Sequence, residues 1–161
     1  MAVSIQEYLS TVYEADCEYV DGEVLERNWG ESDHSLLQGA VGAYFYLRRK
    51  EWGICALFAL RLRISATRIR VPDVCVFLGE PQEQIPSVPP FICIEVLSPE
   101  DRVLPLHDKI ADYLNFGVPY VWLLDPQTRQ AWRCTKGAMV EVSELRTENP
   151  TMVVPLADLF D

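Results

Sequence analysis

The chain has 161 residues, of which 49% are hydrophobic and 24% charged, values typical of a folded soluble protein. This length predicts one domain over residues 1–161, with a core large enough to need no disulfide or structural metal. The formal net charge of −10 argues against broad, salt-driven binding to nucleic acid. No apolar run approaches the length of a membrane span.

The N-terminal residues MAVSIQEYLS lack the basic start and apolar run of a secretion signal. The five cysteines are odd in number, widely spaced and without a CxxC pair, which disfavours a zinc site and a disulfide framework. We therefore expect reduced core cysteines in a cytoplasmic protein.

In chain order, Ser4 and the glutamate three positions later form a capping-box pattern, which predicts a short first helix. Asp21-Gly22, between two alternating runs, predicts a tight hairpin. Apolar residues at helical spacing predict a second helix over residues 34–50. Because Gly39 and Gly42 weaken this helix in isolation, a close packing contact is expected there.

Residues 57–64 alternate between apolar and polar side chains, which predicts a half-buried strand. A second strand is expected over residues 68–77, with Pro72 at its start or at a sheet edge. A proline-rich loop over residues 79–90 precedes a continuous apolar run, residues 91–97, which predicts a buried strand.

A helix is expected over residues 106–116 and is closed by Gly117. Residues 118–125 then predict a strand, and a final hairpin is expected around residues 136–137. This order of elements predicts an α/β (α+β) fold with a mixed central sheet.

The most informative residue is Glu95, at the centre of the apolar run FICIEVL. A buried carboxylate there costs several kcal/mol unless a cation or partner compensates it. Asp73 begins the preceding strand, and carboxylates from two strands can share one divalent ion such as Mg²⁺. Such an ion polarises a phosphoryl oxygen and activates a water molecule. The alternative is a structural ion pair between Glu95 and an arginine.

Seven of the 14 basic residues lie between residues 48 and 70. This segment either faces the phosphates of a nucleic acid or forms an ordinary solvated strand face, and both readings remain open. The candidate phosphate contacts are Arg61, Arg63 and Arg70, together with Arg102, whose alternative is an ion pair with a neighbouring acid.

Several motifs together resemble the Uma-two family of restriction endonucleases in the PD-(D/E)XK superfamily. The resemblance extends from about Tyr8 to Phe160, and the motifs that carry it are Asp21-Gly22-Glu23, His34, Pro72-Asp73-Val74, Glu95-Val96-Leu97-Ser98-Pro99, Asp108-Lys109, Tyr113, Gly117-Val118-Pro119 and Trp122-Leu123-Leu124-Asp125-Pro126.

The resemblance implies a restriction-endonuclease-like core with flanking helices and an N-terminal helix and hairpin. It implies Mg²⁺ or Mn²⁺ bound by Asp73, Glu95 and the backbone carbonyl of Val96. The superfamily's usual lysine position is occupied by Leu97 here, and Lys109 on the following helix matches the displaced lysine.

Lys109 is expected either to orient the attacking water and stabilise phosphorane charge, or to be a solvated lysine paired with Asp108 or Asp112. Related nucleases often complete the metal shell with an upstream acid, so Glu23 or His34 is a further candidate. Their alternatives are a turn acid and a polar residue at a helix N-terminus, where the helix dipole disfavours charged histidine.

These residues predict Mg²⁺-dependent hydrolysis of a nucleic-acid phosphodiester, with DNA as substrate and a homodimer that suits cutting two strands. The rival hypothesis is a catalytically silent nuclease-like module that binds a partner or assembles. Metal binding and phosphodiester cleavage separate these hypotheses from each other and from a purely structural protein.

Overall fold

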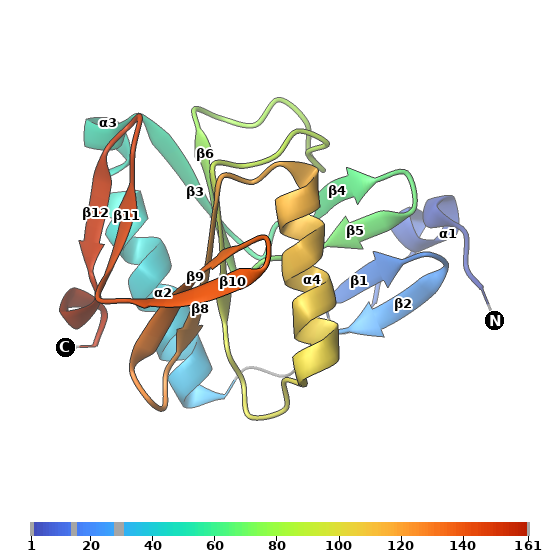
Figure 1. Cartoon of the computed structure of the whole chain (residues 1–161). Coiled ribbons are helices and arrows are strands. Elements are labelled where there is room, and N and C mark those ends of the chain that lie inside the picture. Colours follow the sequence, from blue (N-terminus) through green and yellow to red (C-terminus); the bar gives the residue numbers. More distant parts are fainter. Residues whose placement is uncertain (1, 14–15, 28–30, 161) are drawn as a thin grey trace.

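The computed structural model describes residues 2–13, 16–27 and 31–160 (Figure 1). Its helices are α1 (Ile5–Ser10), α2 (Ser32–Leu47), α3 (Arg49–Trp52), α4 (Val103–Phe116) and the 3₁₀ helix η1 (Leu156–Leu159). Its strands are β1 (Cys17–Val20), β2 (Glu23–Glu26), β3 (Ile54–Phe58), β4 (Leu62–Ser65), β5 (Arg68–Arg70), β6 (Val74–Leu78), β7 (Ile92–Val96), β8 (Tyr120–Asp125), β9 (Gln130–Thr135), β10 (Ala138–Val142), β11 (Glu144–Thr147) and β12 (Met152–Pro155).

The largest sheet has six strands in the order β10-β9-β8-β7-β6-β3. Its neighbours are antiparallel except β7 and β8, which run parallel. Parallel neighbours need a crossover, and α4 supplies it between these two strands. The mixed sheet therefore follows from this one helical connection.

Helices α2 and α4 cover opposite faces of the six-stranded sheet (Figure 1). Strand β7 shows the division: Ile92, Ile94 and Val96 pack in the cluster that includes α2, whereas Cys93 packs with α4. Because both faces are covered, every residue of β7 is buried, which explains the continuous apolar run in the sequence. Glu95 shares the α4 face with Cys93.

A second, four-stranded sheet has the order β2-β1-β5-β4 and is antiparallel throughout. Helix α1 packs against it through a small core that contains Tyr8, Tyr19 and Ile69. The predicted helix cap is confirmed, since Ser4 Oγ accepts a hydrogen bond from the backbone N–H of Glu7 at 3.1 Å. Helix α1 and the β1–β2 hairpin are the predicted N-terminal helix and hairpin, whereas their pairing with β5 and β4 was not predicted.

The prediction of one strand over residues 57–64 is wrong. Strand β3 ends at Phe58 in the six-stranded sheet, and β4 begins at Leu62 in the four-stranded sheet. Between them Ala59 adopts a left-handed conformation, φ 47°, and its N–H donates to the carbonyl of Asp73 at 3.2 Å. The predicted strand over 68–77 divides in the same way into β5 and β6, so the chain crosses between the sheets twice, next to Asp73.

The other predicted elements agree better with the structure. The hairpins at Asp21-Gly22 and Lys136-Gly137 are confirmed, and Gly117 ends α4 in a left-handed conformation, φ 105°. The predicted helix over residues 34–50 is α2 followed by the short α3. The α/β mixed-sheet class is therefore confirmed. None of the helices in the described part of the chain is both long and apolar enough to cross a bilayer.

The two glycines of α2 differ, although both were expected to allow close packing. A Cβ atom built on Gly42 would lie 1.9 Å from Cζ of Phe58, whereas one built on Gly39 would have no other atom within 4 Å. Only Gly42 therefore meets the expectation.

We expect Gly39→Ala to raise the free energy of unfolding by roughly 1 kcal/mol through helix propensity alone. Gly42→Ala should instead lower it by about 1–3 kcal/mol, because the Phe58 ring must move. Urea denaturation of both variants tests the contrast. Adding Phe58→Ala to Gly42→Ala should remove the clash, and equal effects of the two alanines would contradict this account.

Candidate active site

A cleft of about 320 Å³ opens where the four-stranded sheet, β7 and α4 come together, and it is lined by Asp73, Glu95, Lys109 and Glu18 among others. One water molecule occupies roughly 30 Å³ in the liquid. The cleft therefore has room for a hydrated ion beside a phosphodiester group. Asp73 comes from the crossing that precedes β6, Glu95 from β7, and Lys109 from α4.

Three neighbours hold the Asp73 carboxylate. Its Oδ2 accepts a hydrogen bond from the backbone N–H of Val96 at 2.8 Å, and His34 Nε2 lies 3.3 Å from the same oxygen. Arg27 Nη2 forms an ion pair with Oδ1. Burial alone would favour the neutral acid, but His34 and Arg27 outweigh it and lower the pKa of Asp73, so the group is anionic.

His34 reaches the cleft from the first turn of α2. Its hydrogen bond to Asp73 raises the pKa of the imidazole above its ordinary value. The helix dipole disfavours the charged imidazole, as expected, but the Asp73 carboxylate in direct contact has the larger effect on the pKa of His34.

Glu95 is buried on the α4 face of the sheet. Its Oε1 accepts a hydrogen bond from the Tyr113 hydroxyl at 2.6 Å and lies 3.1 Å from Lys109 Nζ. Burial raises the pKa of Glu95 to about 8, even though Lys109 pulls it down.

The Lys109 side chain points into the protein. Its Nζ lies 3.0 Å from Glu18 Oε2, 3.1 Å from Glu95 Oε1 and 3.1 Å from the Val71 carbonyl oxygen. Burial would lower its pKa, but the two carboxylates raise it, so Lys109 is an ammonium ion. With an acceptor for each of its three protons, Lys109 acts as a fixed cation between Glu18 and Glu95.

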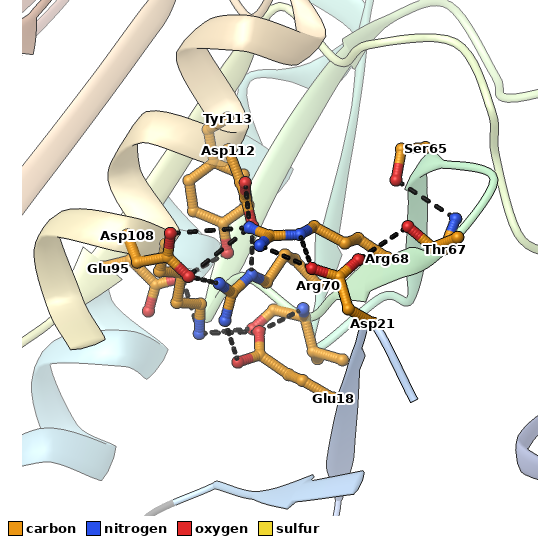
Figure 2. Close-up of polar contacts among 12 residues, drawn as sticks. Glu18, Asp21, Ser65, Thr67, Arg68, Arg70, Glu95, Asp108, Asp112 and Tyr113 are labelled. Atoms are coloured by element: carbon orange, nitrogen blue, oxygen red, sulfur yellow. Dashed lines mark hydrogen bonds and ion pairs between the residues drawn. The ribbon is translucent and has the colours of Figure 1, made fainter. Parts of the chain in front are cut away.

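Lys109 belongs to a chain of ion pairs that runs from the exposed Asp21 to Glu95, and Figure 2 labels its other members. The acids of this chain outnumber its bases: they are Asp21, Glu18, Glu95, Asp108 and Asp112, against Arg68, Arg70 and Lys109. The alternative of a solvated Lys109 paired with Asp108 or Asp112 is wrong, since both acids contact Arg68 and Arg70 instead.

The first hairpin contributes Glu18 to the cleft, not the predicted Glu23. Glu23 is exposed on β2 and does not belong to the described residues that line the cleft. Glu18 is buried; it accepts the backbone N–H of Val71 at 2.7 Å, and Arg70 Nη1 lies 3.3 Å from it. Strand alternation could have indicated it, since neighbouring residues of β1 point to opposite faces and Tyr19 faces α1.

The structure places the four predicted phosphate-binding arginines in different environments. Arg70 lines the cleft but is buried and paired with Glu18, Asp108 and Asp112, so it is a structural cation. Arg61 and Arg63 do not belong to the described lining residues. Arg102 is exposed at the cleft rim, where it precedes the first residue of α4, and it remains a candidate for contacting phosphate.

The chemistry of the donors fits a hard divalent cation. Asp73 and Glu95 offer carboxylate oxygens to one cleft, and such oxygens, completed by water, are what Mg²⁺ and Mn²⁺ prefer. Within residues 2–13, 16–27 and 31–160, no three His, Cys, Asp or Glu side chains are arranged as a ready-made metal centre. Backbone oxygen or water must therefore supply the remaining ligands, and the predicted role of the Val96 carbonyl stays a prediction.

Comparisons with known proteins agree with this architecture. A family model named Uma2 and described as "Putative restriction endonuclease" matches residues 5–160. The chain is similar to a crystal structure described as a putative nuclease belonging to DUF820 from Anabaena variabilis ATCC 29413, with a TM-score of 0.80 and 20% identity, over 98% of this chain and 97% of that one. This likeness supports the restriction-endonuclease-like fold, and no curated protein matches the chain. The chain therefore belongs to the Uma2 family of putative restriction endonucleases.

Proposed function

We propose that this chain is a Mg²⁺- or Mn²⁺-dependent endonuclease that hydrolyses phosphodiester bonds of DNA. Family membership supports nuclease activity in general. The observation that carries the finer proposal is the placement of Asp73 and Glu95 in one cleft, with Glu95 buried in an apolar strand. An idle domain would gain stability by losing such a buried acid.

A divalent ion held by Asp73 and Glu95 would polarise the scissile phosphate and acidify a bound water. The chain's own residues prepare that site. The backbone N–H of Val96 orients the Asp73 carboxylate, and the Tyr113 hydroxyl orients Glu95. Lys109 keeps a positive charge beside Glu95, where it stabilises negative charge that develops on the phosphate.

The rim of the cleft limits how DNA is bound. Glu26, Glu100 and Asp101 line it and would repel a phosphate backbone, whereas Arg102 is an exposed cation at the same place. We therefore propose that DNA binds through a few contacts near the metal. A single domain over residues 1–161 offers little surface for a duplex, which favours a homodimer, and five free cysteines favour a cytoplasmic location.

The test is titration of Mg²⁺ and Mn²⁺ by calorimetry, with cleavage of plasmid and single-stranded DNA measured on the same samples. Asp73→Asn keeps an oxygen for the Val96 N–H but removes the charge, so we expect it to weaken metal binding by about 100-fold and to abolish cleavage. The matched control is Asp158→Asn, an exposed change on η1.

Each outcome has one reading. Metal binding and cleavage that are both lost in Asp73→Asn but retained in Asp158→Asn support the nuclease. Metal binding without cleavage of any DNA supports the silent nuclease-like module. Absence of metal binding in the wild-type protein would refute the metal-dependent mechanism.

A further inference from the structure

Arg27 lines the cleft on the side of the first hairpin. It directly follows β2, and its backbone N–H donates to the Asp16 carbonyl at 3.0 Å. Its side chain is 16% exposed and runs inward, with Nη2 paired to Asp73 Oδ1 and Nη1 3.4 Å from Asp16 Oδ2. Arg27 thus links an exposed acid to a carboxylate at the bottom of the cleft.

The two oxygens of Asp73 are held differently. Oδ2 is held by the backbone N–H of Val96, whose position is set by β7, whereas Oδ1 contacts the guanidinium at the end of a long side chain. Glu95 also attracts the Arg27 guanidinium. Arg27 therefore supplies to Asp73 the positive charge that a bound metal would supply.

Binding a guanidinium and a divalent ion to the same carboxylate at once is electrostatically unfavourable. Two cations held by the same carboxylate repel each other strongly in a cleft that is partly shielded from water. A metal bound to Asp73 and Glu95 must therefore displace Arg27. The Arg27 side chain can turn while its backbone N–H keeps the hydrogen bond to the Asp16 carbonyl.

We propose that Arg27 is an exchangeable counter-ion: it neutralises Asp73 in the metal-free protein, and in the metal-loaded protein it moves to a phosphate oxygen of the substrate. This inference rests on the proposed metal-dependent nuclease function. The planar donor fork of arginine suits phosphate as well as carboxylate. The exchange would couple metal binding to DNA binding. The displaced arginine would also offset part of the negative charge of the acids at the cleft rim.

The test compares the wild type with Arg27→Gln, Arg27→Lys and the control Arg146→Gln, which removes an exposed, ion-paired arginine from β11. Mn²⁺ affinity is measured by calorimetry, and binding of a short labelled DNA duplex by anisotropy, with and without Ca²⁺. Ca²⁺ accepts the same oxygen ligands but polarises phosphate more weakly.

We expect Arg27→Gln to bind Mn²⁺ about 10-fold more tightly than the wild type, since no cation must leave. Its DNA affinity should fall about 10-fold with Ca²⁺ and remain unchanged without it. Arg27→Lys keeps the charge that neutralises Asp73, so it should fold and bind Mn²⁺ like the wild type, yet bind DNA less well with Ca²⁺. Arg146→Gln should change none of these values.

Unchanged or weaker Mn²⁺ binding in Arg27→Gln would overturn the exchange and leave the proposed function standing. An equal loss of DNA affinity with and without Ca²⁺ would overturn the move to phosphate. If no protein in the set bound Mn²⁺, the metal-dependent function itself would fail, and this inference with it.

Discussion

Glu95→Gln is expected to reduce DNA cleavage by about 1,000-fold or more while leaving the metal-free protein at least as stable as the wild type. Cleavage falls because glutamine carries no charge with which to hold a divalent ion. Stability holds because the amide oxygen still accepts the Tyr113 hydroxyl, and because Lys109 keeps Glu18 as a partner. The chain of ion pairs has more acids than bases, so losing one acid reduces the repulsion among its carboxylates.

The rival reading of Glu95 as a structural ion-pair partner makes the opposite prediction. Removing one member of a buried pair then costs about 3–5 kcal/mol, with no change in metal binding. Urea denaturation in EDTA, together with cleavage in Mg²⁺, separates the two readings. Glu95→Ala serves as a comparison, since it also leaves a cavity and should be less stable than Glu95→Gln under either reading.

Local patterns were sufficient to locate Glu95. A carboxylate inside a continuous apolar run is improbable unless something compensates it, and this holds whatever the fold around it. The ends of several elements were predictable because their signals are also local. The Ser4 cap, the turn at Asp21-Gly22 and the helix end at Gly117 each depend on residues a few positions apart. These signals lie within one helical turn or one hairpin.

The division of residues 57–64 between two sheets carries no comparable signal. The break depends on Ala59 adopting a left-handed conformation, which alanine rarely does. This conformation is supported by the hydrogen bond from the Ala59 N–H to the Asp73 carbonyl. Asp73 is 14 positions away in the sequence, and the pairing of the strands brings the two residues together. The alternation of apolar and polar residues continues across the break as it would in a single strand. Pattern analysis therefore could not find it.

The partners of the charged residues were also beyond local patterns. Glu18 and Lys109 are 91 positions apart in the sequence and meet only because α4 lies against the four-stranded sheet. The sequence shows the sign of the charge on Arg70, but not that Glu18 and Asp112 neutralise it. For this reason the basic segment was interpreted as a candidate phosphate surface, although the structure uses part of it to hold the sheet and α4 together.

Lys109→Met is expected to cost about 3–5 kcal/mol of stability and to abolish cleavage. Methionine fills a similar volume, so the loss is mainly electrostatic: Glu18 and Glu95 become buried carboxylates without their common cation. Mg²⁺ should recover part of the stability, because an ion beside Glu95 replaces some of the lost charge. Thermal denaturation with and without Mg²⁺ measures this, and Lys136→Met in the exposed β9–β10 turn is the control.

A double variant distinguishes the structural part of Lys109 from its catalytic part. In Lys109→Met with Glu18→Gln, one of the two carboxylates that lose Lys109 is gone, and the glutamine oxygen still accepts the Val71 N–H. We expect stability to return to within about 1–2 kcal/mol of the wild type, whereas cleavage stays lost because no ammonium remains beside the phosphate. Recovery of cleavage together with stability would mean that Lys109 only neutralises Glu18, and that the chemistry needs nothing from it beyond a correctly folded cleft.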